Sequence, residues 1–327
     1  MKILILNKSE VERLLPIPVC IDLMADALLS LARGEVILPL RPVLRIPDSA
    51  NAFALMPAYS TSLRAIGTKL ITVYPGNHGT RLDSHQGAVV LFDGENGSLL
   101  AVMDAASITA IRTAAVSGVA TRQLARKDAG TLAILGSGVQ ARTHLEAMVA
   151  VRSFKKVFVW SRNSEHARAL VSSALPSARV EFEVVADPEA AVENADVVCT
   201  VTASREPVLR GEWLKDGAHV NAVGASIPTA RELDTSAVAR SRVFVDRRES
   251  ALNEAGDILI PIREGAIRAD HIAGEIGDLL ASGDGGRRND TEITLFKSLG
   301  LAIEDLASAH YLHERATREQ AGTWADL

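Results

Sequence analysis

One segment in the middle of the chain has the composition and spacing of a dinucleotide-binding turn. Residues 136–141 read Gly-Ser-Gly-Val-Gln-Ala and follow a short apolar run. The first glycine permits a tight turn from strand to helix, and the second lets the backbone approach a pyrophosphate without a Cβ in between. Free N–H groups at the start of the next helix would bind the phosphates. An incidental loop is the alternative, but the flanking strand, helix and second strand favour a dinucleotide site. The cofactor-binding residues predicted by this turn are Gly136, Gly138, Val139 and Gln140.

A group of polar residues follows the strand expected at 156–161. Ser161, Arg162 and Asn163 stand where an NAD-preferring site would place an acidic residue for the ribose hydroxyls. A hydroxyl and a guanidinium suit a 2′-phosphate instead. The alternative is that Arg162 is an ordinary solvated residue after a strand. We therefore predict that these three residues bind the cofactor, with NADPH preferred and NADH as the alternative.

Two later strands, expected at 197–202 and 219–223, end in residues that should face the same cofactor. Ligands bind at the carboxyl ends of strands in open parallel sheets. The cofactor-binding residues added by this argument are Thr200, Thr202, Val223 and Ser226.

Three basic residues lie in apolar segments of the first 115 residues. Lys69 stands in a strand-like run, Arg112 in an alanine-rich helix, and Arg41 in a second strand-like run. Such a residue commonly extends its charged group to solvent or pairs with a carboxylate. Three of them in one domain, beside a dinucleotide-binding domain, favour a clamp for an anionic substrate.

The elements that would position these residues form two different patterns. From residue 130 onward apolar strands alternate with helices, which predicts a doubly wound parallel sheet of the Rossmann type in an α/β protein. The earlier part has one helix and then β-rich segments with a hairpin turn at 93–97, which predicts an α+β domain. The later pattern comprises strands at 131–136, 156–161, 180–185, 197–202, 219–223 and 243–246, with helices at 139–151, 164–175 and 188–194. The earlier pattern comprises a helix at 19–33, strands at 36–46, 52–56, 65–74, 88–92 and 99–103, and a helix at 107–126 capped by Ser107. A long helix at 292–318 is expected near the end of the chain.

Composition excludes several classes of function. The chain has 327 residues, enough for two domains, and its 47% hydrophobic content suffices for a large core. A formal net charge of −5 without a long basic run argues against nucleic-acid binding. Two cysteines cannot form a disulfide framework or a four-thiolate zinc site, and no metal site is expected. No apolar stretch reaches the ~18 residues that a membrane-spanning helix needs, so we expect a cytoplasmic protein without a membrane segment.

Eight short segments, spread in order along the chain, carry a resemblance to a known family. The sequence resembles the ornithine cyclodeaminase/mu-crystallin family over essentially its whole length. Colinear matches of this number are far more specific than a glycine-rich turn alone. The matching segments are residues 56–60, 69–72, 84–88, 101–104, 108–117, 136–141, 221–226 and 296–300.

The resemblance implies an organisation and a set of roles. It implies a homodimer whose first domains pair through their β-strands, with a Rossmann domain on each side. The substrate-binding and dimerisation domain would be residues 1–115, joined by a C-terminal helix at 305–327, and the NAD(P)-binding domain would be residues 116–304. Arg41, Lys69 and Arg112 would hold the substrate's α-carboxylate close to the nicotinamide, with Ser226 beside the substrate. The resemblance also adds Arg112, Thr113 and Leu299 to the cofactor-binding residues.

Within this family, the residue at position 226 separates two kinds of chemistry. Ornithine cyclodeaminases carry an Asp after the strand motif Asn-Ala-Val-Gly-Gly, whereas residues 221–226 here read Asn-Ala-Val-Gly-Ala-Ser. A serine cannot act as a carboxylate base or pair with a cationic amine. The sequence therefore looks more like the ketimine reductase and Δ1-pyrroline-2-carboxylate reductase branch, which reduces cyclic imino acids with NAD(P)H.

The reaction that this resemblance favours is reduction of Δ1-pyrroline-2-carboxylate or Δ1-piperideine-2-carboxylate to L-proline or L-pipecolate. The alternatives are ornithine cyclodeaminase, an amino-acid dehydrogenase such as alanine dehydrogenase, and an NADPH-dependent ligand-binding protein of the mu-crystallin type. His85 is a candidate proton donor because histidine titrates near neutral pH. It could equally line the cofactor side of the cleft, and Lys69 could equally supply the proton. The catalytic residues expected are Lys69, Arg112 and His85.

Overall fold

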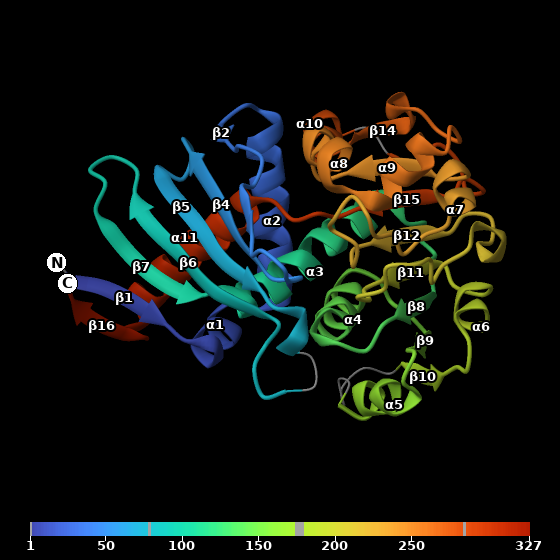
Figure 1. Cartoon of the computed structure of the whole chain (residues 1–327), viewed down its shortest axis with the longest axis horizontal. Coiled ribbons are helices and arrows are strands. Elements are labelled where there is room, and N and C mark those ends of the chain that lie inside the picture. Colours follow the sequence, from blue (N-terminus) through green and yellow to red (C-terminus); the bar gives the residue numbers. More distant parts are fainter. Residues whose placement is uncertain (1, 78–79, 174–179, 284–285) are drawn as a thin grey trace. The chain divides into compact units, whose positions relative to one another are not determined.

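The chain divides into two compact units in a computed structural model that describes residues 2–77, 80–173, 180–283 and 286–327 (Figure 1). The first unit is Met1–Arg112 together with Gly300–Leu327, and the second is Thr113–Leu299. The sequence had placed the division after residues 115 and 304, and the roles that it assigned to the two domains stay predictions.

The first unit is built on one mixed sheet with the strand order β16-β1-β7-β6-β5-β4-β2, in which β3 also pairs with β4. Its strands are β1 (Lys2–Leu6), β2 (Val36–Ile37), β3 (Val43–Arg45), β4 (Ala52–Ser60), β5 (Ala65–Val73), β6 (His85–Asp93), β7 (Leu99–Asp104) and β16 (Thr323–Asp326). Its helices are α1 (Lys8–Leu14), α2 (Ile17–Ala32), α11 (Ala302–Glu319) and the first part of α3 (Ala105–Leu124), and a short 3-10 helix, η1 (Pro75–Asn77), follows β5.

Helix α11 packs on one face of this sheet, which we call the inner face (Figure 1). Along β5, side chains of alternate residues point to opposite faces, and Ala65, Gly67, Lys69 and Ile71 share the inner one. An ideal Cβ at Gly67 would lie only 2.9 Å from Leu306 Cδ1 of α11, so the glycine permits the close approach of the helix. A side chain on the inner face of β5 therefore lies next to α11.

The second unit is an eight-stranded parallel sheet with the order β10-β9-β8-β11-β12-β15-β13-β14. The chain leaves β8 in one direction toward β9 and later returns to its other side with β11, as in a doubly wound Rossmann-type sheet. The α/β fold class predicted from the sequence is thus confirmed. The strands are β8 (Thr131–Leu135), β9 (Lys156–Trp160), β10 (Glu181–Val184), β11 (Val197–Thr200), β12 (His219–Ala222), β13 (Arg242–Val245), β14 (Ile272–Glu275) and β15 (Thr294–Lys297). The helices are α4 (Val139–Val151), α5 (Ser164–Ser173), α6 (Pro188–Val192), α7 (Thr235–Ala239), α8 (Arg248–Glu254), α9 (Gly256–Arg263) and α10 (Ile276–Ser282), with 3-10 turns η2 (Gly211–Trp213) and η3 (Ala269–His271).

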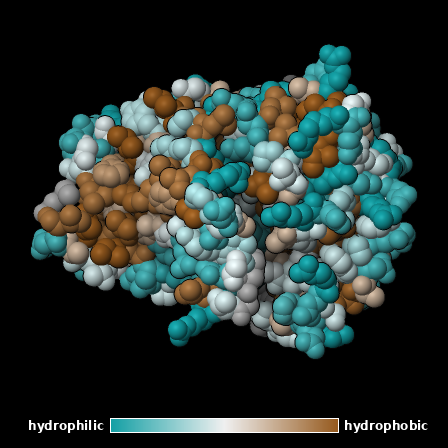
Figure 2. Space-filling view, in the orientation of Figure 1, coloured by the Kyte–Doolittle hydropathy of each residue, from teal (hydrophilic) through white to brown (hydrophobic). Residues whose placement is uncertain are grey.

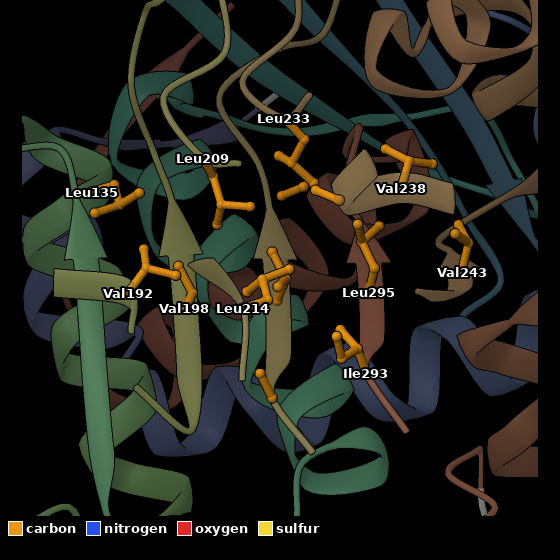
Figure 3. Close-up of a cluster of buried hydrophobic side chains, with 14 of the residues drawn as sticks. Leu135, Val192, Val198, Leu209, Leu214, Leu233, Val238, Val243, Ile293 and Leu295 are labelled. Atoms are coloured by element: carbon orange, nitrogen blue, oxygen red, sulfur yellow. The ribbon is translucent and has the colours of Figure 1, made fainter. Parts of the chain in front are cut away.

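The core of the second unit lies where this sheet meets its helices and connecting segments (Figure 3). Val198 and Leu295 come from central strands, whereas Leu209 and Leu233 come from connections and complete the cluster. All four residues of β11, of β12 and of β15 are buried, which matches the rule that parallel strands covered on both faces read as continuous runs. This core holds the carboxyl ends of the strands in fixed register.

Several local expectations were wrong. The long helix expected at 292–318 is strand β15 followed by α11, because residues 294–297 pair between β12 and β13 and Gly300 (φ 77°) turns the chain. The C-terminal helix expected to reach residue 327 ends at Glu319, and β16 then pairs with β1. Helix α3 begins at Ala105, and the carboxylate of Asp104, not Ser107, accepts the N-terminal hydrogen bond. The strand expected at 36–46 is divided into β2 and β3 around two prolines. Residues 174–175 of the expected helix at 164–175 lie outside the described residues.

Among the described residues, no single helix has the length and apolar character needed to cross a membrane. Helices α1 and α2 meet that requirement only as a pair, bent by 81°.

Candidate active site

Four charged side chains are buried together in the first unit, and we call them the buried ion cluster: Lys69, Arg112, Glu304 and Asp305. Lys69 Nζ lies 2.9 Å from Asp305 Oδ2 and 3.2 Å from Oδ1. Arg112 donates from Nε to Asp305 Oδ1 at 3.0 Å and from Nη1 to Glu304 Oε2 at 2.7 Å. Asp305 therefore bridges the two cations, whereas the ion pair of Glu304 is with Arg112.

Three elements position the members of the cluster: β5 carries Lys69, α3 carries Arg112, and α11 carries both carboxylates. Lys69 points from the inner face of β5, where it pairs in register with Met56 of β4 and Val89 of β6. The carboxylates come from the first turn of α11, where negative charge is favoured by the helix dipole. Gly300 makes room just before that helix, because an ideal Cβ there would lie 2.1 Å from Arg112 Nη1.

The two cations of the cluster differ in how firmly they hold their protons. The pKa of Lys69 is lowered to about 8, chiefly by burial and then by the neighbouring Arg112 charge, while Asp305 opposes the shift. Burial also acts to lower the pKa of Arg112, but Asp305 and Glu304 outweigh it and the pKa is raised. Arg112 is therefore a permanent cation, whereas Lys69 can exchange a proton close to neutral pH.

The other two predicted residues of the first unit lie differently. Arg41 is half-buried between β2 and β3, and its charge adds a small lowering of the Lys69 pKa, which places it near the cluster. His85 is exposed at the start of β6, with Nδ1 3.0 Å from Ser84 Oγ. It pairs with Val73, four residues beyond Lys69, which is about 13 Å along the strand. The structure brings Lys69 and Arg112 together but leaves His85 away from that pair.

Sequence reasoning missed the carboxylates of the cluster. Pairing with a carboxylate was the alternative interpretation for each basic residue, and for Lys69 and Arg112 that pairing is present. The clamp for an anionic substrate stays a prediction. The two acidic residues give no sequence signal, because only their burial in α11 distinguishes them from other acidic residues. The hydroxyl of Thr109, 3.2 Å from Lys69 Nζ, was missed as well.

In the second unit, the predicted glycine-rich turn joins β8 to α4. Gly136 has φ 134°, and an ideal Cβ there would lie 2.7 Å from the carbonyl oxygen of Val201. Gly138 is the N-cap residue of α4 and has nothing within 4 Å of an ideal Cβ. Val139 is 63% exposed, and among the described residues the buried Gln140 Oε1 has no hydrogen-bond partner. An open helix N-terminus, with its free N–H groups, fits a dinucleotide phosphate group.

The end of β9 lies beside this turn. The hydroxyls of Ser137 and Ser161 are 2.8 Å apart, which links the turn to the segment after β9. Arg162 and Asn163 follow and are exposed, and Asn163 Oδ1 accepts a hydrogen bond from the N–H of Glu165 at the start of α5. The guanidinium predicted to bind a 2′-phosphate is therefore at the same sheet edge as the glycine-rich turn.

A buried carboxylate that the sequence did not reveal holds the next two strand ends. Glu232 accepts hydrogen bonds from Thr200 Oγ1 at 2.8 Å, from Thr202 N at 2.6 Å and Oγ1 at 2.7 Å, and from Gly224 N at 2.6 Å. Burial, and then the Asp257 charge, raises the pKa of Glu232, while the hydrogen bonds from Thr202 oppose the shift. The hydroxyls of Thr200 and Thr202 are thus already engaged, and their part in cofactor binding stays a prediction.

A second buried ion pair, Lys297 with Asp257, contacts the loop that carries Ser226. Lys297 Nζ lies 2.9 Å from Asp257 Oδ2 and donates to the carbonyl of Ala225 at 2.5 Å. Ser226 itself is exposed after β12. The remaining predicted cofactor residues are the half-buried Val223, Thr113, which is buried on α3, and Leu299, which is buried and donates from its N–H to Asp246.

No group of three or more His, Cys, Asp or Glu side chains among the described residues is arranged to hold a metal ion. Cys20 and Cys199 are both buried, and burial raises the pKa of each thiol to about 12. A thiol with so high a pKa is a poor nucleophile at neutral pH. The chemistry of the described residues therefore lies with the buried ion cluster and the glycine-rich edge.

Comparison with known proteins places these features in context. The model of the ornithine cyclodeaminase/mu-crystallin family matches residues 1–320. The ketimine reductase mu-crystallin of Mus musculus is 44% identical over 281 residues, which are 86% of this chain and 86% of that protein.

Two solved structures are similar over nearly the whole chain. The Δ1-pyrroline-2-carboxylate reductase of Thermococcus litoralis, in complex with NADH and L-proline, has a TM-score of 0.95 and 39% identity, covering 98% of this chain and 99% of that one. An archaeal alanine dehydrogenase dimer with bound NAD has a TM-score of 0.93 and 32% identity, with 100% of both chains covered.

The lowered pKa of Lys69 predicts how stability depends on pH. Below about pH 8 Lys69 is charged in both states, so the folded protein bears the cost of burying the charge. Between that pH and ~10.4, the value for an unfolded lysine, only the unfolded state binds the proton. The free energy of unfolding should therefore rise with pH through this window, by up to about 1.4 kcal/mol per pH unit.

Comparison with Lys69→Met isolates this effect from other titrations. Urea denaturation of both proteins across the window should show the wild type gaining stability relative to the variant as pH rises. A difference that stays flat with pH would show that Lys69 keeps an ordinary pKa.

Proposed function

Because the chain belongs to the ornithine cyclodeaminase/mu-crystallin family, we propose that it is an oxidoreductase that reduces a cyclic ketimine carboxylate with NAD(P)H. The proposed substrates are Δ1-pyrroline-2-carboxylate and Δ1-piperideine-2-carboxylate, and the products are L-proline and L-pipecolate. The observation that carries the proposal is the buried pair of cations, Lys69 and Arg112, in a chain that is similar to a reductase bound to NADH and L-proline.

The cations of the first unit would bind and orient the substrate carboxylate. Arg112, with support from Arg41, holds that group by charge-assisted hydrogen bonds, so that one face of the ring is presented. The reduced nicotinamide, when bound, supplies a hydride to the imine carbon. Lys69 donates a proton from Nζ to the imine nitrogen, which makes the carbon a better hydride acceptor and yields the secondary amine. Neutral Lys69 then regains its proton from solvent.

The chain's own residues also support a cofactor choice. Gly136, Gly138 and the start of α4 would hold the pyrophosphate, and Ser161 with Arg162 would hold a 2′-phosphate. We therefore propose NADPH as the preferred cofactor, with NADH as the alternative. A nicotinamide cofactor as such is supported by the NADH and NAD bound in the similar structures.

A second candidate is an amino-acid dehydrogenase, which the similarity to archaeal alanine dehydrogenase favours. Ornithine cyclodeamination is less well supported because Ser226 replaces the carboxylate that would hold and deprotonate a second amine. A hydroxyl, with its much higher pKa, cannot take that role at neutral pH.

The outer face of the first sheet supports a homodimer. Ile37 pairs with Tyr59, Tyr59 with Ile66, and Ile66 with Phe92, so four apolar side chains form a row on the face opposite α11. Ile37 is 67% exposed and Ile66 41% exposed. Figure 2 shows hydrophobic surface gathered over the strands of this unit. A sheet face that met only water would be mostly polar, so we propose that a second copy covers it.

Turnover of cyclic imines tests the function directly. The wild type should oxidise NADPH with Δ1-piperideine-2-carboxylate. Lys69→Met removes the proton donor, and Arg112→Ala misplaces the carboxylate and so misaligns the reacting carbon; each should lower kcat/KM by about 100-fold. Arg64→Ala is the control, since Arg64 is exposed and pairs with the exposed Glu95 on the surface of the same unit.

Other outcomes of the same assay would replace the proposal. Ammonia released from L-ornithine with NAD would identify a cyclodeaminase, and oxidation of L-alanine without imine turnover would identify an amino-acid dehydrogenase. Tight NADPH binding without any turnover would identify a ligand-binding protein.

The cofactor preference depends on Arg162. Arg162→Ala should raise the KM for NADPH roughly ten- to a hundred-fold, the equivalent of ~1.5–3 kcal/mol for a charged hydrogen bond, and should leave the KM for NADH nearly unchanged. Arg168→Ala, an exposed arginine on α5, removes the same charge and should change neither value. Equal effects of Arg162→Ala on both cofactors would contradict a 2′-phosphate contact.

The dimer can be tested by placing a charge on the outer face. Ile66→Asp should shift the protein to a monomer in sedimentation velocity, because a buried unpaired carboxylate disfavours association. Val19→Asp, at an apolar residue on α2 that is 36% exposed, is the control and should leave the sedimentation coefficient unchanged. A monomeric wild type at micromolar concentration would exclude the dimer.

A further inference from the structure

Asp305 occupies a special place among the charges of the first unit. Its carboxylate contacts both cations of the buried ion cluster, with Oδ1 accepting from Lys69 Nζ at 3.2 Å and from Arg112 Nε at 3.0 Å. It is 1% exposed, so water does not weaken these interactions. The adjacent Glu304 is equally buried and forms an ion pair with Arg112.

The groups that face Lys69 come from several elements. Arg112 and Thr109 come from α3, Asp305 from α11, and Arg41 acts from the segment between β2 and β3. The register partners Met56 and Val89 on the neighbouring strands are uncharged. Burial and the charges of Arg112 and Arg41 favour the neutral form of Lys69. The carboxylate of Asp305 favours its charged form.

We propose that Asp305 is a positioning residue that keeps Lys69 protonated and fixed beside Arg112, so that Lys69 can donate its proton to the substrate nitrogen. This inference rests on the proposed function, because it names the source of the proton in that reaction. When the N–H bond of Lys69 breaks and the proton moves to the imine nitrogen, the hydride from the cofactor forms the new C–H bond. After this transfer the cluster contains one cation, Arg112, and two carboxylates. Its net negative charge favours the return of a proton to Lys69.

The pKa of Lys69 is a second observation that supports this role of Asp305. A lysine buried beside an arginine without a carboxylate would be largely neutral at pH 7 and could not act as an acid. The pKa of Lys69 remains near 8 with Asp305 present, so that a large fraction is charged at neutral pH. Glu304 forms its ion pair with Arg112 Nη1 at 2.7 Å, which makes Glu304→Gln a matched control on the same helix.

The test compares Asp305→Asn with Glu304→Gln, two changes that each remove one negative charge and keep the shape of the side chain. The pH dependence of kcat/KM with NADPH and Δ1-piperideine-2-carboxylate should lose activity as Lys69 deprotonates. In Asp305→Asn this alkaline limb should move to lower pH by about one to three units. In Glu304→Gln it should stay at the wild-type pH, whatever happens to KM. Equal movement in both variants, or a loss of kcat in Asp305→Asn without movement of the limb, would overturn the proposal.

A measurement without turnover separates this inference from the proposed function. The free energy of unfolding is compared between each protein and its Lys69→Met partner as a function of pH, in the wild-type and Asp305→Asn backgrounds. In the Asp305→Asn background, the free energy of unfolding should begin to rise, relative to the Lys69→Met partner, at lower pH. This rise does not require that the protein reduces an imine. If imines are not reduced but this rise moves as expected, the proposed function fails while the coupling of Asp305 to Lys69 holds. If the rise begins at the same pH in both backgrounds, Asp305 does not set the charge of Lys69.

Asp305→Glu keeps the proposal testable if Asp305→Asn does not fold. It retains the charge but lengthens the side chain, so the alkaline limb should stay close to that of the wild type while kcat falls. Movement of the limb in this variant by as much as one unit or more would show that the charge at position 305 is not what holds Lys69 protonated.

Discussion

The first unit depends on the pairing of two buried cations with two carboxylates from a distant part of the chain. Burying an unpaired lysine or arginine costs several kcal/mol, so Lys69 and Arg112 can be inside only if negative charge is brought to them. Asp305 is separated from Lys69 by 236 positions and from Arg112 by 193. The chain of the second unit lies between them. Helix α11 must therefore return to the first sheet before this unit is complete, and Gly67 and Gly300 leave room for it.

The sequence predicted those elements whose signals are local. Six strands of the second unit, β8 to β13, the helix at 139–151 and the hairpin at 93–97 were predicted because period, turn residues and the glycine-rich pattern lie within a few residues of each other. Strand β14 was not predicted. Strand β15 was assigned to a helix because Thr294–Lys297 has only two apolar residues, and period cannot distinguish so short a segment from a first helical turn. Only its pairing with β12 and β13, which are remote in sequence, makes it a strand.

The same distinction separates the site residues that were found from those that were not. Lys69, Arg112 and the glycines stand out by residue type against their neighbours. Glu232, Asp257, Glu304 and Asp305 do not, because acidic residues are common and only their burial makes them unusual. Position at a strand end selected Thr200 and Thr202, but it could not reveal that Glu232 accepts from both of their hydroxyls. Sequence reasoning thus predicts which edge of a sheet would bind a ligand. It predicts less well which side chain at that edge is available to contact the ligand.

Stability does not explain why the buried ion cluster exists. Four well-packed hydrophobic residues of similar volume could serve the fold as well as these three ion pairs, since desolvation offsets much of the attraction between buried charges. What hydrophobic residues could not supply is one permanent cation beside one whose pKa is near 8. The cluster is also balanced in charge before any substrate arrives. A neutral imine with its carboxylate adds one negative charge to the cluster. Transfer of the Lys69 proton to the imine nitrogen makes the substrate a zwitterion and leaves the negative charge on the cluster, where it favours the return of a proton to Lys69.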